Sequence, residues 1–66
     1  MQIFLNGEIR QVENDCNITA LIKELNLENK RLAVEVDQEI IPRSQFTTHL
    51  LAEGNKVEII HAIGGG

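Results

Sequence analysis

Asn6 and Gly7 separate two short strand-like runs at the beginning of the chain. A tight type I′ turn needs positive φ at both of its central residues, and Asn followed by Gly adopts that conformation most readily. In the run before this pair, Ile3 and Leu5 fall on the same face of an extended strand. The pair therefore predicts a β-hairpin whose first strand turns Ile3 and Leu5 toward the core.

The second strand of this hairpin is expected over residues 8–13. Its apolar residues do not follow the two-residue period of a strand, because Ile9 and Val12 fall on opposite faces. Two arrangements remain open for this run. Either a β-bulge brings both residues to the core, or one of the two faces outward.

A helix of about two turns is expected after the hairpin. Asn17 is suited to its N-cap, since a side-chain oxygen there accepts a hydrogen bond from a free amide of the first turn. Asn26 is suited to the left-handed position that closes a helix, with Leu27 folding back as a hydrophobic contact. Between these ends, apolar residues recur at the spacing of one helical face: Ile18, Leu21, Ile22 and Leu25.

Further extended segments are expected in the second half of the chain. Residues 32–37 alternate in polarity, and the core-facing members of that run are Leu32, Val34 and Val36. A turn then leads to a short strand at residues 39–41, which Pro42 ends because proline cannot donate to a sheet ladder.

The last part of the chain is expected to contain a short helical turn and one more strand. The turn and its loop cover residues 43–51 and are pinned to the core by Phe46 and Leu50. The final strand covers residues 56–62, and its alternation directs toward the core Val57 and Ile59.

This order of elements predicts an α+β fold, the ubiquitin-like β-grasp, in which one main helix packs across a mixed sheet. Its first and last strands lie side by side as a parallel pair, an arrangement that requires a crossover connection. The opposite face of the sheet then has no helix over it. Apolar side chains on such a face indicate a docking surface for a protein partner, although Phe4 alone could be an ordinary sheet-face aromatic. The expected contact residues are Phe4, Glu58, Ile60 and Ala62, beside Ala33 and Glu35.

The composition is that of one small globular domain with an acidic surface. The chain has 66 residues, of which 42% are hydrophobic, and a net charge of −4. It lacks the basic clusters and stacking aromatics of nucleic-acid-binding proteins, so no nucleic acid is expected as a partner. A signal peptide and a membrane-length apolar run are also missing, and the single cysteine fits a reducing compartment. We therefore expect a cytoplasmic protein with no membrane association.

Three glycines, Gly64, Gly65 and Gly66, follow the final strand. We expect a β-grasp domain over residues 1–63 and a flexible Gly-Gly-Gly tail over residues 64–66. Such a tail reaches roughly 10 Å and, having no Cβ atoms, can enter a channel too narrow for other residues. It suits a terminal carboxylate that reacts inside a partner, whereas a frayed end or a cloning remnant is the alternative.

The whole chain closely resembles the ThiS family, the sulfur carrier proteins of thiamine biosynthesis. The resemblance rests on the opening strand with its Asn-Gly turn, on the segment EVDQEIIPR at residues 35–43, and on the ending EGNKVEIIHAIGGG at residues 53–66. Paired terminal glycines also occur in ubiquitin-like modifiers and in the small subunit of molybdopterin synthase. The compact length, Ile41-Pro42-Arg43 and the apolar-Gly-Gly-Gly ending favour the thiamine carrier.

The resemblance implies a carrier that an enzyme acts on, not an enzyme. A ThiF-like adenylating partner uses ATP and Mg²⁺ to activate the Gly66 carboxylate, and a persulfide donor then supplies sulfur to give a thiocarboxylate. A ThiG-like thiazole synthase receives that sulfur. Gly64 and Gly65 are implied partner contacts, and the chain itself binds no cofactor. A carrier for molybdopterin synthesis or tRNA thiolation, and a non-catalytic ubiquitin-like interaction module, remain the alternatives.

The remaining reactive side chains are assigned structural or contact roles. Cys16 has no base near it in the sequence and is expected to be a structural thiol. His49 and His61 are too few for a zinc site, which normally takes three or four protein ligands, so no metal is expected. His61 is close to the tail in sequence and is expected to contact a partner or to pack.

Overall fold

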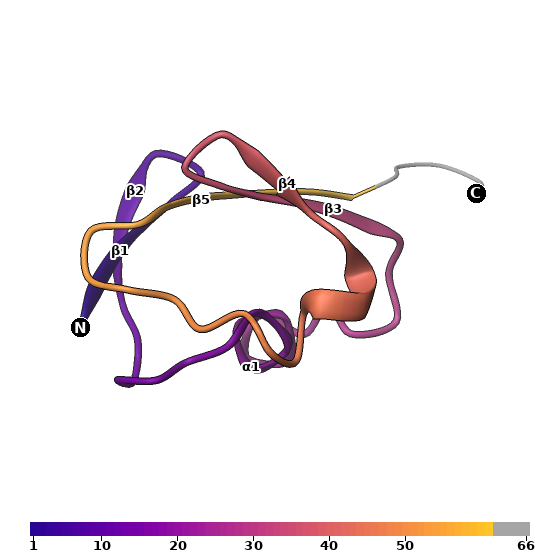
Figure 1. Ribbon diagram of the computed structural model, residues 1–66, viewed down its shortest axis with the longest axis horizontal. Coiled ribbons are helices and arrows are strands. Elements are labelled where there is room, and N and C mark those ends of the chain that lie inside the picture. Colours follow the sequence, from indigo (N-terminus) through magenta and orange to yellow (C-terminus); the bar gives the residue numbers. More distant parts are fainter. Residues whose placement is uncertain (62–66) are drawn as a thin grey trace.

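The computed structural model describes residues 1–61. The five strands form one sheet, and the main helix packs against one of its faces (Figure 1). This is the predicted α+β β-grasp arrangement. The elements in chain order are β1 (Gln2–Leu5), β2 (Glu8–Gln11), α1 (Ile18–Glu24), β3 (Leu32–Val36), β4 (Glu39–Ile41), the short 3₁₀ helix η1 (Arg43–Gln45) and β5 (Lys56–His61).

The strand order across the sheet is β2-β1-β5-β3-β4, so the last strand of the chain lies at the centre. β5 runs parallel to β1, with Leu5 opposite Val57, and antiparallel to β3, with Val36 opposite the same Val57. Parallel neighbours cannot be joined by a tight turn, and the connection that contains α1 makes part of the required crossover. The predicted adjacency of the first and last strands is confirmed.

The predicted hairpin is present, and of the two residues Ile9 and Val12 it is Ile9 that faces outward. Asn6 and Gly7 have φ values of 49° and 86°, as a type I′ turn requires. The pairing of β1 with β2 runs without interruption from Gln2 to Leu5, so no bulge brings Ile9 inward. Ile9 is 63% exposed, whereas Val12, just beyond the strand, is buried. β2 ends at Gln11, two residues before the predicted end.

The helix has the predicted caps. Asn17 Oδ1 accepts a hydrogen bond from the Ala20 amide at 2.7 Å, which satisfies one free donor of the first turn. Asn26 adopts φ 60°, and the Leu27 amide donates to the Ile22 carbonyl at 3.0 Å. That bond closes the helix in the manner of a Schellman motif.

The core lies between α1 and the covered face of the sheet. The loop before β5 contributes Leu51, which is 4% exposed, and not Leu50, which is 56% exposed. The prediction that Leu50 pins this loop was therefore wrong. The Leu51 amide donates to the Cys16 carbonyl at 2.8 Å, and in extended chain adjacent side chains point opposite ways, so Leu50 faces outward. The buried residues are Ile3, Val12, Cys16, Ile18, Leu21, Ile22, Val34, Val36, Ile41, Phe46, Leu51, Val57 and Ile59.

Candidate functional site

β5 leads the chain toward its C-terminal residues and forms the base of the candidate site. On the core side, Val57 and Ile59 are 0% and 7% exposed, as predicted. Asp37 fixes the beginning of the strand, because its Oδ1 accepts a hydrogen bond from the Lys56 amide at 2.9 Å and its Oδ2 accepts one from Asn55 Nδ2 at 2.8 Å. The strand is thus held by the core, by β1 at its beginning and by β3 as far as His61.

The tail itself is not covered by the structure. The strand was predicted to reach Ala62, and β5 is described as far as His61. The predicted contact residues Ala62, Gly64 and Gly65, and the predicted reacting residue Gly66, lie outside the described residues.

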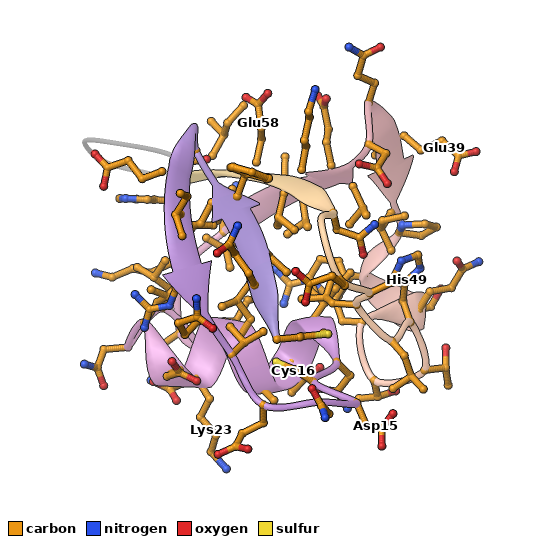
Figure 2. The ribbon with its side chains drawn as sticks, turned by 90° about the vertical axis from the view of Figure 1, so that its left-hand side faces the viewer. Asp15, Cys16, Lys23, Glu39, His49 and Glu58 are labelled. Atoms are coloured by element: carbon orange, nitrogen blue, oxygen red, sulfur yellow. The ribbon has the colours of Figure 1, made fainter. Side chains whose placement is uncertain are left out.

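The sheet face opposite α1 presents the other predicted contact residues. We call it the open face. Figure 2 shows the Glu58 side chain pointing away from the helix, while Cys16 lies beside the helix on the other side of the sheet. The strand registers place on the open face Phe4, Ile9, Ala33, Glu35, Ile40, Lys56, Glu58 and Ile60.

The open face is not one continuous apolar patch. Ile60 lies opposite Ala33, near the base of the tail, whereas Phe4 lies opposite Lys56, at the other end of β5. Ile60 lies four residues after Lys56 along the strand, a distance of about 13 Å. Ile60 is 59% exposed, and Phe4 is half-buried. The face therefore offers two apolar areas with charged residues between them.

Two exposed isoleucines of the open face were not among the predicted contact residues. Ile9 lies opposite Phe4, and Ile40 lies opposite Glu35. They are 63% and 74% exposed. A signal for both was available, since each lies in a hairpin whose tight turn fixes the register and hence the partner residue.

Two glutamates lie opposite each other at the centre of the open face. Glu35 on β3 lies directly opposite Glu58 on β5. Like charges in this position destabilise a sheet. A basic side chain from a partner would relieve that repulsion, so the pair favours docking of a positively charged protein surface.

Cys16 does not have the character of a nucleophile. It is a free, buried cysteine, and its Sγ lies 3.4 Å from the Asn17 carbonyl oxygen. Burial raises the pKa of the Cys16 thiol above its ordinary value, and the carboxylates of Glu24 and Glu13 raise it further. Because the thiolate is the reactive form, this thiol is poorly reactive at neutral pH.

No metal site occurs in the part of the chain that the structure describes. Within residues 1–61, no three or more His, Cys, Asp and Glu side chains gather in a way that could hold an ion. His49 lies in the loop after η1, and His61 lies at the exposed end of β5. Separately, none of the helices among these residues has the length and apolar character needed to span a bilayer.

Comparison with known proteins finds relatives among thiazole synthases and sulfur carrier proteins. The chain is 36% identical over all of its 66 residues to a thiazole synthase of Paramagnetospirillum magneticum, and it covers 20% of that protein. It is 33% identical to the sulfur carrier protein ThiS of Bacillus subtilis, covering 94% of this chain and 96% of that one. The crystal structure of the thiamine biosynthesis protein ThiS from Geobacter metallireducens matches with a TM-score of 0.84 and 28% identity, over 100% of both chains.

These similarities differ in how much of the other protein they cover. The chain spans about a fifth of the length of the thiazole synthases that it matches, but nearly all of the carrier proteins. The model of the ThiS family matches residues 3–66, which includes every element described above except the first residue of β1. The chain therefore belongs to the ThiS family of sulfur carrier proteins.

Proposed function

We propose that this sulfur carrier of thiamine biosynthesis holds its sulfur as a thiocarboxylate on Gly66. The observation that supports this is the position of β5, which anchors the residues before the tail in the middle of the sheet. An anchored strand presents a short tail to a partner at a defined place, which lowers the entropic cost of bringing the reacting group into line.

The proposed chemistry begins with activation of the carboxylate, which is a poor electrophile at neutral pH. A Gly66 oxygen attacks the α-phosphorus of ATP and pyrophosphate leaves, giving an acyl-adenylate. The terminal sulfur of a persulfide then attacks the acyl carbon and AMP leaves. Cleavage of the sulfur–sulfur bond by a second thiol frees the thiocarboxylate. Charge stabilisation in each step comes from the partner's groups.

ATP and Mg²⁺ are assigned to an adenylating partner of the ThiF type, and a separate persulfide provides the sulfur. Over residues 1–61 the carrier has no cluster of metal-ligating side chains, which supports placing the Mg²⁺ on the partner. In addition, α1 begins after Asn17 and not after a glycine-rich loop of the kind that cradles phosphates.

We assign a thiazole synthase of the ThiG type as the acceptor of the sulfur. The support is that thiazole synthases of two organisms each contain a segment similar to this entire chain. Carrier and acceptor joined in one polypeptide meet at high effective concentration, which favours a direct transfer between them. This favours thiazole formation over molybdopterin synthesis or tRNA thiolation.

The proposed docking surface is the open face together with the tail. Ile60 and Glu58 are its central residues, Phe4 is at its far end, and Ala62, Gly64 and Gly65 continue it toward the reacting group. The supporting observations are the exposure of Ile60, at 59%, and the cross-strand pair of acidic residues Glu35 and Glu58.

We also propose the cytoplasm as the compartment and residues 1–63 as the folded body, with residues 64–66 as the tail. The support for the compartment is Cys16, the only cysteine of the chain, which is a free thiol. A reducing compartment keeps such thiols free.

The docking proposal is tested by ATP–pyrophosphate exchange with the adenylating partner. Ile60→Asp should lower exchange while circular dichroism remains that of the parent, because Ile60 is largely exposed. Leu50→Asp is the matched control, since Leu50 is similarly exposed, at 56%, but lies outside the open face. Equal exchange by the two folded variants would remove the support for docking through this face.

A further inference from the structure

The two neighbours of β5 do not accompany it equally far. β3 pairs with it as far as His61, opposite Leu32. β1 pairs with it only as far as Val57, because the chain turns away at Asn6 and Gly7. Beyond Val57, the peptide groups of β5 that point toward β1 no longer face a strand.

The side chain of Asn6 occupies the first of these positions. The Ile59 amide donates to Asn6 Oδ1 at 2.9 Å, and Asn6 Nδ2 donates to the Ile59 carbonyl at 3.3 Å. The main chain of Asn6 makes the preceding bond, from its amide to the Val57 carbonyl at 2.9 Å. In a parallel ladder the next acceptor would be the carbonyl of Asn6 itself. The turn diverts that carbonyl, and the side-chain amide takes its place.

Position 6 has two requirements: a positive φ, and a side chain that can pair with the amide and the carbonyl of Ile59. Asparagine is unusual in meeting both. It tolerates the positive φ of 49° found there, because its short polar side chain makes local hydrogen bonds in the left-handed conformation. Its planar amide also carries both a donor and an acceptor. Glycine would satisfy the turn but not hold Ile59, and aspartate would offer an acceptor without the donor. Since glycine would also make the turn, the need for a turn does not by itself explain the contact between Asn6 and Ile59.

We propose that Asn6 is a positioning residue for the reactions at Gly66, through its hold on Ile59. This inference rests on the proposed function, since it concerns the same reacting carboxylate. Ile59 precedes Gly66 by seven residues, which span at most about 25 Å when extended. Without the hold of Asn6, β5 beyond Val57 is hydrogen-bonded on the β3 side only, so the base from which the tail starts is less fixed in position. Misplacement of about 1 Å at a reacting group can cost on the order of a hundredfold in rate.

The test is steady-state adenylation of the Asn6→Gly carrier by its adenylating enzyme. This variant keeps the positive φ and removes both hydrogen bonds to Ile59. We expect kcat to fall at least about tenfold, because the carboxylate is misplaced. We expect KM for the carrier to stay within about twofold, because the open face is unchanged. A merely destabilised carrier would instead raise the apparent KM and leave kcat as it was.

Asn26→Gly is the matched control. Asn26 also has a positive φ, of 60°, but it lies after α1 and away from β5, so kcat and KM should both equal those of the parent. Asn6→Asp retains the acceptor for the Ile59 amide and should recover part of the lost kcat. Amide hydrogen exchange, followed residue by residue by NMR on the carrier alone, should be faster at Ile59 in Asn6→Gly and unchanged there in Asn26→Gly.

Several results would overturn the positioning role. One is a parental kcat for Asn6→Gly together with faster exchange at Ile59; another is a raised KM with a parental kcat. If neither Asn6 variant folds, the contact serves folding alone, and the positioning role is again overturned. If the parent carrier is not adenylated at all, the proposed function fails instead, and the exchange experiment still reports whether Asn6 holds Ile59.

Discussion

Replacing Glu58 with Gln should have opposite effects on the stability of the free carrier and on its docking. Glu58 lies directly opposite Glu35 on the open face, and cross-strand like charges cost about 0.2–1 kcal/mol. Removing one of the two charges should therefore stabilise the carrier by about that amount. For a domain of this size, the corresponding rise in melting temperature is about 1 to 8 °C.

The same change should weaken association with a basic partner surface. An exposed ion pair contributes about 0.2–1 kcal/mol, so KM for the carrier in adenylation should rise by up to about fivefold. Both effects should shrink as salt is added, because the charges are exposed and are screened over about 8 Å at physiological ionic strength. Thermal melting and pyrophosphate exchange, each at low and high salt, measure the two effects.

Glu28→Gln is the control for net charge. Glu28 is exposed in the connection between α1 and β3 and is not part of the open face. It should change neither the melting temperature nor KM by a comparable amount. A lower melting temperature for Glu58→Gln would contradict the repulsion between Glu35 and Glu58. Equal KM values for Glu58→Gln and Glu28→Gln would contradict a docking role for Glu58.

Three further predictions concern the folded body. Leu21 is fully buried, so Leu21→Ala should lower the free energy of unfolding in urea by about 2–5 kcal/mol, and a loss below about 1 kcal/mol would contradict its packing. Asn17→Ala removes the hydrogen bonds to the Ala20 amide and the Thr47 carbonyl and should lower the free energy of unfolding by about 0.5–2 kcal/mol in the same assay. Asn17→Asp keeps the acceptor of the cap and should lose less stability, and equal losses for the two variants would argue against the cap. The raised pKa of Cys16 means that the folded state holds the thiol proton more tightly than the unfolded chain, so stability should decline as pH rises above the ordinary thiol value of 9.0. Thermal melts across this range should show a shallower decline for Cys16→Ala, and identical slopes would contradict the assignment.

Local chemistry made much of the fold predictable. The hairpin turn, the N-cap at Asn17 and the helix end at Asn26 each depend on a few neighbouring residues, and each was found as predicted. The periods of the strands likewise identified Val57 and Ile59 as core residues. These features need no knowledge of distant contacts, because residue type and spacing decide them.

Features that depend on contacts distant in sequence were harder to predict. The loop that contains Leu50 and Leu51 has no regular period, and the hydrogen bond from Leu51 to Cys16 decides which leucine faces inward. Similarly, the contact of Asn6 with Ile59 joins residues 53 apart in the chain. It depends on the register of β1 against β5, which no local pattern encodes.

The candidate site was predicted in part. Strand alternation placed Glu58 and Ile60 on the open face, and the structure agrees. The division of that face into two apolar areas was missed, because the offset between Phe4 and Ile60 follows from the parallel register of β1 and β5. The roles of these residues and of Gly66 stay predictions.

The most direct test is mass spectrometry of the intact carrier after incubation with its adenylating enzyme, ATP, Mg²⁺ and a persulfide donor. We expect one terminal oxygen to be replaced by sulfur and peptide mapping to place the sulfur on Gly66. A carrier lacking Gly66 should stay unmodified, since its carboxylate falls short by about 3 Å, and Gly65→Val should be blocked by its side chain. Sulfur found on Cys16, or normal modification of the shortened tail, would contradict a thiocarboxylate on Gly66.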